Sequence, residues 1–466
     1  MKRKIAIYIV LICTLLGSAP YLTGMLAQTK FIDVISLLNE VETVPATVTL
    51  LEYHRGWRKS TAKTQVTIYS DRGNKLKEYR LVFNHDIRHG PFVQLLDDNW
   101  KLWEFARAVI FSKLELSQEA EKILLAEVGQ THLLGLSGIF AINGEVKIIA
   151  TGPQIKLKEH AGTDRVAFKG INGEWIISSD MKEIKGAVVL PGMDFDLEGS
   201  QLLASNLNYS THFVKSPEGL WPGSFDAKLD KISLVLEQGK FNLSLEGFAS
   251  KGSMVANGAT TNLLGSFHID KATLNGKTYG PIEYSNSLNH VDTTVLKSFL
   301  TLNHQLKTGD STASNKLTQF FISRMPDFLQ RRPEFTIEKL YIHTPDGDVN
   351  GQAYIAAGGI DTNNLNIQQL LKSIVAKASL EIPKIMLKDM LLMQYSKEYE
   401  QKQATMGATD PALPPVDQSV DETLSKWLQA RTLTEKDQYY VVTLEFKDGN
   451  FLINGHANQI PLPLQR

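Results

Sequence analysis

The chain has 466 residues, of which 43% are hydrophobic and 21% charged, and its formal net charge at pH 7 is −1. This balance excludes an intrinsically disordered chain, and the length allows two or three domains. A nearly neutral chain also lacks the basic field that nucleic-acid binding needs, so we expect no nucleic-acid partner.

The N-terminus combines a basic patch with a long uncharged stretch. Lys2, Arg3 and Lys4 precede Ile5–Ala27, which contains no charged residue. A membrane-spanning helix needs roughly 20 apolar residues, and basic residues at its start favour a cytoplasmic N-terminus. The sequence therefore predicts a transmembrane anchor over residues 1–28, with the bulk of the chain exported.

A cleaved signal peptide is the alternative interpretation of this segment. Its apolar core is shorter, roughly 7–15 residues, and small residues mark its cleavage site. Gly17-Ser18-Ala19 is the best cleavage candidate, but Pro20 follows it and disfavours cleavage. The only cysteine, Cys13, also lies in this segment, so the rest of the chain cannot form an internal disulfide.

Residues 43–284 read as a series of strands. Short alternating or β-branched runs are separated by Gly, Asn and Asp, a pattern typical of antiparallel sheets. Asn172-Gly173 and Asn275-Gly276 are predicted hairpin turns, because both turn positions favour a positive φ; Asp71–Asn74 is a further turn candidate. One helix is expected, over Ser117–Val128. The clearest strands are Thr61–Tyr69, Tyr79–Ile87, Gly144–Ile149, Arg165–Ile171, Glu174–Ser178, Ser233–Leu236 and Asn242–Leu245.

The pattern changes near residue 290, where apolar residues begin to recur at helical spacing. Residues 404–418 contain three prolines and are expected to form a loop, and Pro326 is expected to end or kink its helix. The predicted helices are Thr293–Leu306, Lys316–Leu329, Ile367–Ala378, Lys384–Glu400 and Thr423–Ala430. The predicted strands are Phe335–Thr344, Val349–Ala356, Tyr439–Phe446 and Phe451–His456.

These elements predict a mainly β fold. We expect an extended antiparallel meander sheet, helical inserts in the C-terminal third and an N-terminal transmembrane helix. The expected domains are the anchor over residues 1–28, a β-rich domain over 29–290 and an α+β domain over 291–466.

Three stretches resemble a known family. They are Tyr53–Ser60 (YHRGWRKS), Val82–Pro91 (VFNHDIRHGP) and the terminal hairpin with Asp448-Gly449 and Ile453–Gly455. Together with the N-terminal segment, they are similar to the YdgA-like family of Gram-negative bacterial envelope proteins. A second aromatic residue usual after the tryptophan is missing, because Arg58 and Lys59 follow Trp57. The resemblance implies an inner-membrane anchor and a β-rich periplasmic body, and it implies no reaction.

The motifs supply the candidate site residues, which are Arg55, Gly56, Trp57, His89, Gly90 and Pro91. Arg55 and Trp57 suit a cation–π or ligand-binding corner. The competing interpretation packs Trp57 in the core and uses Gly56 for a tight bend. We expect His89 to hydrogen-bond nearby backbone while Gly90-Pro91 ends the strand. His85 and His89 lie about 13 Å apart on a strand, too far to share a metal.

No catalytic or cofactor-binding motif is present. The chain contains no G-x-S-x-G, Walker A, H-E-x-x-H or C-x-x-C sequence. Gly309-Asp310-Ser311 lies between helical candidates rather than at the strand-to-helix turn that a lipase nucleophile requires. We therefore expect no enzymatic activity, no cofactor and no metal.

Two non-enzymatic functions follow from this pattern. The preferred hypothesis is a scaffold or interaction protein of the envelope. The alternative is binding or transfer of a lipid or another hydrophobic envelope component on an apolar sheet face. The apolar run Ile385–Met393 suits either a lip for a lipid or partner, or a helix face packed on the sheet. The oligomeric state is left open.

Overall fold

The structure is a computed structural model. It describes residues 2–41, 46–71, 76–94, 103–128, 134–158, 165–197, 200–236, 240–307, 313–358, 367–405 and 414–457. The chain forms two compact units: unit 1 contains Met1–Lys240 and Leu296–Ser323, and unit 2 contains Phe241–Val295 and Arg324–Arg466. The division at residue 240 differs in place from the boundary expected near residue 290, which falls inside a strand.

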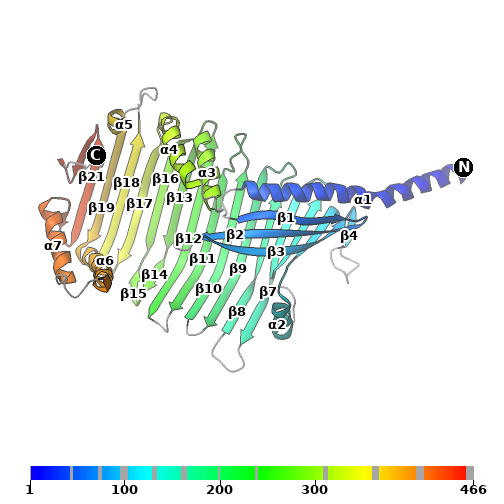
Figure 1. The fold of residues 1–466 in the computed structure, drawn as a ribbon, viewed down its shortest axis with the longest axis horizontal. Helices are drawn as coiled ribbons and strands as arrows, with labels where there is room; N and C mark the ends of the chain where they lie inside the picture. The colour runs from blue at the N-terminus through cyan, green and yellow to red at the C-terminus, as the bar shows by residue number, and fades with distance from the viewer. Residues whose placement is uncertain are drawn as a thin grey trace. The chain divides into compact units, whose positions relative to one another are not determined.

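Unit 1 is an antiparallel meander that carries one long helix, α1 (Lys2–Glu40) (Figure 1). Its strands are β1 Ala46–Arg55, β2 Lys59–Asp71, β3 Leu76–His89, β4 Phe92–Gln94, β5 Trp103–Leu114, β6 Gly135–Ala141, β7 Val146–Lys158, β8 Arg165–Ile177, β9 Glu183–Leu197, β10 Ser200–Val214 and β11 Gly223–Leu236. They pair in the order β1-β2-β3-β5-β6-β7-β8-β9-β10-β11, and β4 pairs with β5. Sequence neighbours are thus sheet neighbours, which confirms the predicted meander.

Unit 2 contains a second antiparallel series, in the order β12-β13-β16-β17-β18-β19-β21-β22-β23. Its strands are β12 Phe241–Asn257, β13 Thr260–Ile269, β14 Lys271–Leu274, β15 Lys277–Tyr279, β16 Ile282–Asp292, β17 Glu334–Thr344, β18 Gly347–Ala357, β19 Ile374–Pro383, β20 Thr434–Lys436, β21 Tyr439–Lys447, β22 Asn450–Ile453 and β23 His456–Ala457. Short strands β14 and β20 pair with β12 and β21, and β15 pairs with β14.

The remaining helices are α2 Gln118–Val128, α3 Thr293–Lys307, α4 Ala313–Gln330, α5 Ile367–Ser373, α6 Lys384–Thr405 and α7 Val416–Gln429. All but α2 lie after residue 290, as the apolar spacing predicts. Pro326 lies inside α4 instead of ending it. Residues 406–413 of the predicted 404–418 loop lie outside the described residues, and Val416 already begins α7.

One predicted turn is wrong. Asn172-Gly173 lies within β8, where Asn172 pairs with Thr151 of β7 on one side and Val189 of β9 on the other. Two flanking strands supply ladder hydrogen bonds to this segment, and they outweigh its local turn preference. Asn275-Gly276 does form a turn, with φ of 47° and 84°. Most of Asp71–Asn74 lies outside the described residues.

The predicted helix over Ile367–Ala378 is wrong in its second half. Helix α5 ends at Ser373, and residues from Ile374 onward form β19. This strand lies between β18 and β21 and pairs with both. Ile374 and Val375 are β-branched and suit such a central strand.

The core of unit 1 is built under α1. Ala27, Phe31, Val34 and Leu37 recur at helical spacing and are at most 7% exposed. They pack against the inner side chains of the strands, which include Ala62, Ile87, Ala108, Ile110, Phe140, Val146 and Ile177. Helix α1 therefore extends beyond the expected anchor boundary at residue 28 and is part of the folded unit.

Side chains of α1 are described from Gly17 onward. Across the residues whose side chains are described, the structure contains no helix with the combined length and apolarity of a membrane span.

Unit 2 has its own core beneath α6 and α7. Leu391 of α6 and Val420 and Leu424 of α7 are buried against Val349, Ile382 and Tyr440 of the strands. Within the Ile385–Met393 run, only part of the helix faces this core, because Ile385, Met390 and Met393 remain 60%, 49% and 70% exposed.

Candidate functional site

The family motifs meet at one end of the β1–β2–β3 ladder. Arg55 ends β1 and Lys59 begins β2, so Gly56 and Trp57 form the connecting turn. The Gly56 N–H donates to the Lys59 carbonyl at 3.0 Å. A Cβ on Gly56 would lie 2.5 Å from that same oxygen, so the tight bend requires glycine.

The second motif ends β3 beside this turn. The His89 N–H donates to the Arg58 carbonyl at 2.9 Å, and Gly90 N–H donates to the Arg107 carbonyl at 2.8 Å. A Cβ on Gly90 would fall 1.7 Å from the Ala106 carbonyl oxygen. The predicted role of Gly90-Pro91 as the end of the strand is confirmed, because β4 starts only at Phe92.

The His89 side chain ties the two motifs together. Its Nδ1 lies 3.1 Å from the Trp57 carbonyl oxygen and its Nε2 2.8 Å from the Ser60 hydroxyl. A carbonyl only accepts, so Nδ1–H donates to Trp57 and Nε2 accepts from Ser60. The predicted backbone hydrogen bond of His89 is therefore confirmed.

A serine hydroxyl donating to a histidine resembles a nucleophile and its general base. Ser60 is 1% exposed and His89 5% exposed, however, so no substrate reaches the hydroxyl. Burial lowers the pKa of His89, while its backbone hydrogen bond to Trp57 opposes that shift. The pair is a neutral hydrogen bond inside the fold and not an exposed catalytic dyad.

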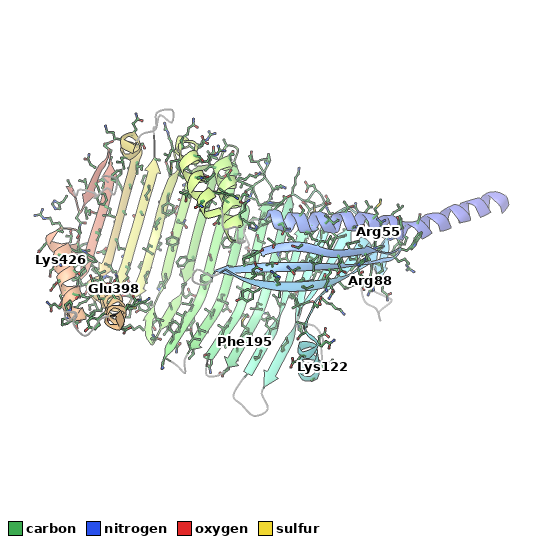
Figure 2. All side chains as sticks on the ribbon, in the orientation of Figure 1. Arg55, Arg88, Lys122, Phe195, Glu398 and Lys426 are labelled. Atoms are coloured by element: carbon green, nitrogen blue, oxygen red, sulfur yellow. The ribbon has the colours of Figure 1, made fainter. Side chains whose placement is uncertain are left out.

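Helix α1 lies directly on these motifs. Thr23 Oγ1 donates to the Gly90 carbonyl at 3.0 Å, and a Cβ on Gly24 would come within 2.4 Å of the His89 ring. We call Tyr21, Thr23 and Gly24, together with the six motif residues, the docking corner. Figure 2 shows Arg55 beside α1 at the end where the helix leaves the strands.

Aromatic and cationic groups cover the outside of the corner. Arg55 Nη2 donates to the Tyr21 hydroxyl at 3.1 Å, and its guanidinium carbon lies 5.0 Å from the Tyr21 ring centroid. The Trp57 ring lies 5.6 Å from the Tyr21 ring. The interpretation that packs Trp57 in the core is wrong, since Trp57 is 59% exposed.

The cation–π partner of Arg55 is thus Tyr21, which the sequence patterns did not single out. Tyr21 lies within the uncharged N-terminal stretch, and no local spacing links it to residue 55. Tyr21, Thr23 and Gly24 lie close together in the sequence Tyr-Leu-Thr-Gly. Their role at the corner becomes apparent only once α1 is known to dock there.

The second histidine, His85, occupies a separate environment on β3. Its Nε2 and Nδ1 lie 2.7 Å from the hydroxyls of Thr64 and Ser112, and Phe31 of α1 packs edge-on at 5.2 Å. Burial lowers its pKa to about 4. The two histidines have different partners, and within the described ranges no three His, Cys, Asp or Glu side chains gather as a metal site would require.

Unit 1 also carries an extended apolar sheet face. Ile177, Ile184 and Phe213 form a row across β8, β9 and β10 that packs into the core beneath α1. Further rows on the same face follow by strand alternation. They are Trp175–Gly186–Thr211–Phe225, Gly173–Val188–Tyr209–Ala227 and Leu190–Leu207–Leu229. We call these three rows the apolar face.

The apolar face has few protruding side chains, because the Trp175 ring covers the two glycines Gly173 and Gly186. A Cβ on Gly186 would lie 2.0 Å from Trp175 Cδ1, and one on Gly173 would lie 2.9 Å from its Cη2. The indole therefore lies across both glycines. Tyr209 and Phe225 stack with centroids 6.3 Å apart.

These rings are incompletely covered. Trp175, Tyr209 and Phe225 belong to none of the buried clusters of the described chain, and Phe225 is 36% exposed. The opposite face of the same strands is mainly polar, although Ile176, Ala187 and Val189 also lie on it. Its polar residues are Glu174, Lys185, Asn208, Ser210, His212, Asp226 and Lys228. A one-sided apolar surface of this kind is suited to an apolar ligand.

Two buried polar atoms accompany the apolar face. The Thr211 hydroxyl lies within its first row, and the Trp221 indole belongs to the adjoining core under α1. Neither Thr211 Oγ1 nor Trp221 Nε1 finds a hydrogen-bond partner among the described residues. Unpaired buried polar atoms cost free energy. Both atoms are closed to solvent, so neither offers a contact to a ligand on the face as the structure stands.

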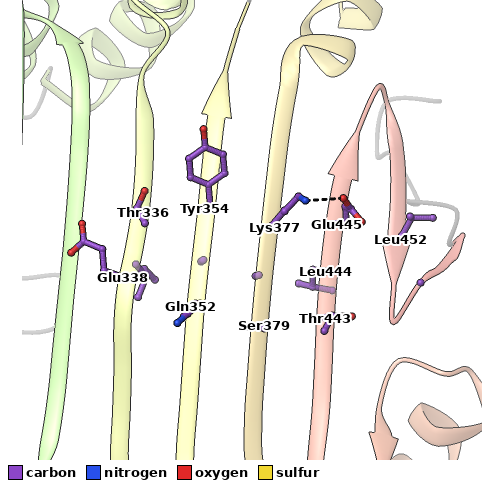
Figure 3. Close-up of a pocket in the computed structure, with 14 residues that line it drawn as sticks. Thr336, Glu338, Gln352, Tyr354, Lys377, Ser379, Thr443, Leu444, Glu445 and Leu452 are labelled. Carbon is purple, nitrogen blue, oxygen red and sulfur yellow. Dashed lines mark ion pairs between the residues drawn. The ribbon is translucent and has the colours of Figure 1, made fainter.

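A separate groove of about 520 Å³ crosses β17, β18, β19, β21 and β22 in unit 2 (Figure 3). Polar and apolar side chains both line it, among them Gln352, Tyr354, Thr443 and Leu444. Its lysine, Lys377, is paired with Glu445 at 3.3 Å.

Comparisons with known proteins place the whole chain in one family. Residues 1–461 match the model of the family described as "Bacterial protein of unknown function (DUF945)". Comparisons with curated proteins and with solved structures gave no match. The family match covers both units and the docking corner. This mainly β chain therefore belongs to the DUF945 family of bacterial proteins of unknown function.

Proposed function

We propose that this protein is a membrane-tethered, non-enzymatic binder of acyl chains in the bacterial envelope. The observation that carries the proposal is the apolar face of β8–β11, with its partly exposed rings Trp175, Tyr209 and Phe225. It favours the lipid-binding hypothesis over the scaffold hypothesis that the sequence alone favours.

The apolar face is continuous with a surface that already holds an apolar partner. The row Ile177–Ile184–Phe213 packs into the cluster that includes Phe31 and Leu37 of α1. The next rows continue the same side of the same strands without that cover. A flexible hydrocarbon chain could lie along them and remove their rings from water.

The shape of the face suits an unbranched acyl chain. Rings lying across Gly173 and Gly186 leave few protruding side chains, as an unbranched chain requires.

The N-terminal sequence supports the tether. Lys2, Arg3 and Lys4 followed by an uncharged stretch from Ile5 suit a single-pass anchor in the inner membrane, with the body in the periplasm. A protein held at a bilayer would have acyl chains within reach of its sheet.

A scaffold role is the second candidate. Ile385, Met390 and Met393 on α6 form an exposed, flexible apolar patch in unit 2. An envelope protein that covers this patch would support that role.

The proposal is tested with cis-parinaric acid, a fatty acid whose fluorescence rises in apolar surroundings. We expect saturable binding to the full chain and a large loss of affinity in Tyr209→Glu, which places a charge on the apolar face. Ser210→Glu is the matched control, since Ser210 is the next residue of β10 and faces the polar side. Equal binding by the two variants would contradict the proposal.

The milder variant Val188→Thr guards against misfolding, because it keeps the side-chain shape and replaces one methyl group with a hydroxyl. Circular dichroism melting confirms that each variant is folded. Native mass spectrometry of protein purified from its own envelope then shows whether lipid accompanies it. A bound lipid mass that disappears in Tyr209→Glu and persists in Ser210→Glu would support the acyl-chain assignment.

A further inference from the structure

We propose that the outer surface of the docking corner is a bilayer-contact surface, at which the folded body rests on the lipid headgroups. This inference rests on the proposed membrane tether and names a partner for the corner, a lipid surface. We call the contact surface the collar; it consists of Tyr21, Arg55, Trp57, Arg58, Phe92 and Phe105.

The path of α1 places the collar next to the tether. Helix α1 is unbroken from Lys2 to Glu40, and it is already attached to the sheet at Thr23 through the Gly90 carbonyl. No linker separates the uncharged stretch from the body. Residues 5–22 span about 27 Å as a helix, close to the ~30 Å hydrocarbon thickness of a bilayer. A helix inserted to this depth brings the corner to the membrane surface.

The collar residues are exposed although they are aromatic. Phe92 is 62% exposed, Trp57 59%, Phe105 57% and Tyr21 39%. They lie in two contacting pairs, Phe92–Phe105 with ring centroids 5.1 Å apart and Tyr21–Trp57 at 5.6 Å. Each pair has a member close in sequence to the Thr23–Gly90 hydrogen bond, because Tyr21 precedes Thr23 by two residues and Phe92 follows Gly90 by two.

Four large exposed rings are costly in water. Scattered exposed apolar residues are normal on a protein surface, but these form two contacting pairs, and each pair includes a residue two positions from the Thr23–Gly90 attachment of α1. Leu22, Met25 and Leu26 in the same helix turns are also 45–51% exposed. The side of α1 that faces away from the sheet therefore presents apolar surface as well.

The polar groups of the collar match the headgroup region. Trp and Tyr are enriched at membrane interfaces, and Arg pairs well with phosphate. Arg55 ends β1 and Arg58 lies in the turn that follows, and both are exposed. The nearby acidic Asp86 is engaged by Lys59 at 3.0 Å, which leaves the turn with an excess of positive charge.

The experiment uses the full chain reconstituted into vesicles of phosphatidylethanolamine and phosphatidylglycerol. Cys13→Ser removes the only natural cysteine. Phe92→Cys then carries an environment-sensitive nitrobenzoxadiazole probe in the collar. Val189→Cys is the matched control, because Val189 is 41% exposed on the polar face of β9 in the same unit. Trp57→Cys repeats the collar measurement at an independent position.

We expect the Phe92 and Trp57 probes to shift to shorter wavelength in vesicles and to lose most of their emission to lipids with shallow nitroxide labels. The Val189 probe should change in neither respect. Equal quenching at all three positions, or none at Phe92 and Trp57, would overturn the collar. A blue shift without nitroxide quenching would indicate a protein partner or second copy instead, and would also overturn it.

Flotation of the vesicles distinguishes the proposed membrane tether from the proposed collar. Protein that floats with the vesicles and shows no collar quenching keeps the tether and loses the collar. Protein that fails to float rejects the tether, and the collar with it. Fatty-acid binding on the apolar face is measured without vesicles and is unaffected by either result.

Discussion

Gly24 of α1 lies directly over the imidazole of His89, so closely that a Cβ on the glycine would come within 2.4 Å of both Cε1 and Nδ1 of the ring. The helix backbone and the neutral ring are therefore in direct contact. Because the His89 ring is also bound to Trp57 and Ser60, it cannot move aside cheaply. The close packing of α1 on the sheet therefore requires glycine at position 24.

This contact predicts that Gly24→Val weakens the docking of α1. The added side chain must displace the helix or the ring, and we expect a loss of about 1–3 kcal/mol in the free energy of unfolding. Gly17→Val is the matched control in the same helix, because nothing lies within 4 Å of a Cβ at Gly17. Denaturant unfolding of both variants measures the difference, and equal midpoints would contradict the observed contact.

His85 predicts a loss of stability in acid. Its pKa is about 4 in the folded protein against the ordinary value of 6.5, so the unfolded chain binds more protons between these values. Stability is therefore unaffected by this group above pH 6.5 and falls as the pH drops toward 4. The full effect is about 3 kcal/mol at 1.36 kcal/mol per pKa unit.

The measurement is the unfolding free energy of the wild type and His85→Gln between pH 4 and 7. We expect a shallower pH dependence in the variant, with a residual slope because burial also lowers the pKa of His89. His54→Gln is the control, since the His54 side chain is 74% exposed. An unchanged slope in His85→Gln would show that His85 is not the titrating group.

The Asn39 side chain is expected to stabilise the edge of β1 and so to contribute to the free energy of unfolding. Its side-chain amide donates to the Val48 carbonyl at 2.9 Å and accepts from the Val48 N–H at 2.8 Å, as a neighbouring strand would. Asn39→Leu keeps the approximate shape and leaves both backbone groups without these bonds. We expect a loss of about 1–3 kcal/mol. Thermal melting beside the exposed control Ser36→Ala checks this, and equal melting temperatures would count against the edge-capping role.

Trp57 predicts a small effect on stability despite its place in the motif. Because its ring is 59% exposed, Trp57→Ala should change the unfolding free energy by less than about 0.5–1 kcal/mol. Ile87→Ala, at a fully buried position two residues before His89, should cost about 2–5 kcal/mol. Chemical unfolding compares them, and a loss in Trp57→Ala as large as that in Ile87→Ala would be inconsistent with an exposed tryptophan.

Much of the secondary structure was predictable because the local spacing of apolar residues determines it. The alternation in Leu207–Phe213 gives a strand with one apolar side. In the C-terminal hairpin, Asp448-Gly449 forms the expected turn, with φ of 53° and 78°. Asn172-Gly173 has similar turn chemistry and lies inside a strand. The difference is that Asn172 has paired strands on both sides, which local sequence does not reveal.

The candidate site was predictable only in part. The two motifs mark Arg55–Trp57 and His89–Pro91 by their unusual composition, but their meeting depends on the β2–β3 register that brings Ser60 opposite Ile87. Tyr21, Thr23 and Gly24 were missed because a contact over more than sixty residues of chain, such as Thr23 to Gly90, leaves no periodic signal.

By itself, the sequence determined the β-rich class of this protein, the order of its strands, its helical C-terminal third and the uncharged N-terminal stretch. These follow from the period of apolar residues and from turn chemistry, which act over a few residues. Only the tertiary structure decided that α1 packs on the sheet, that Trp57 is exposed and that Trp175 lies across Gly173 and Gly186. Such contacts depend on strand register and on the fit of distant side chains, and these are fixed only when the whole sheet has formed.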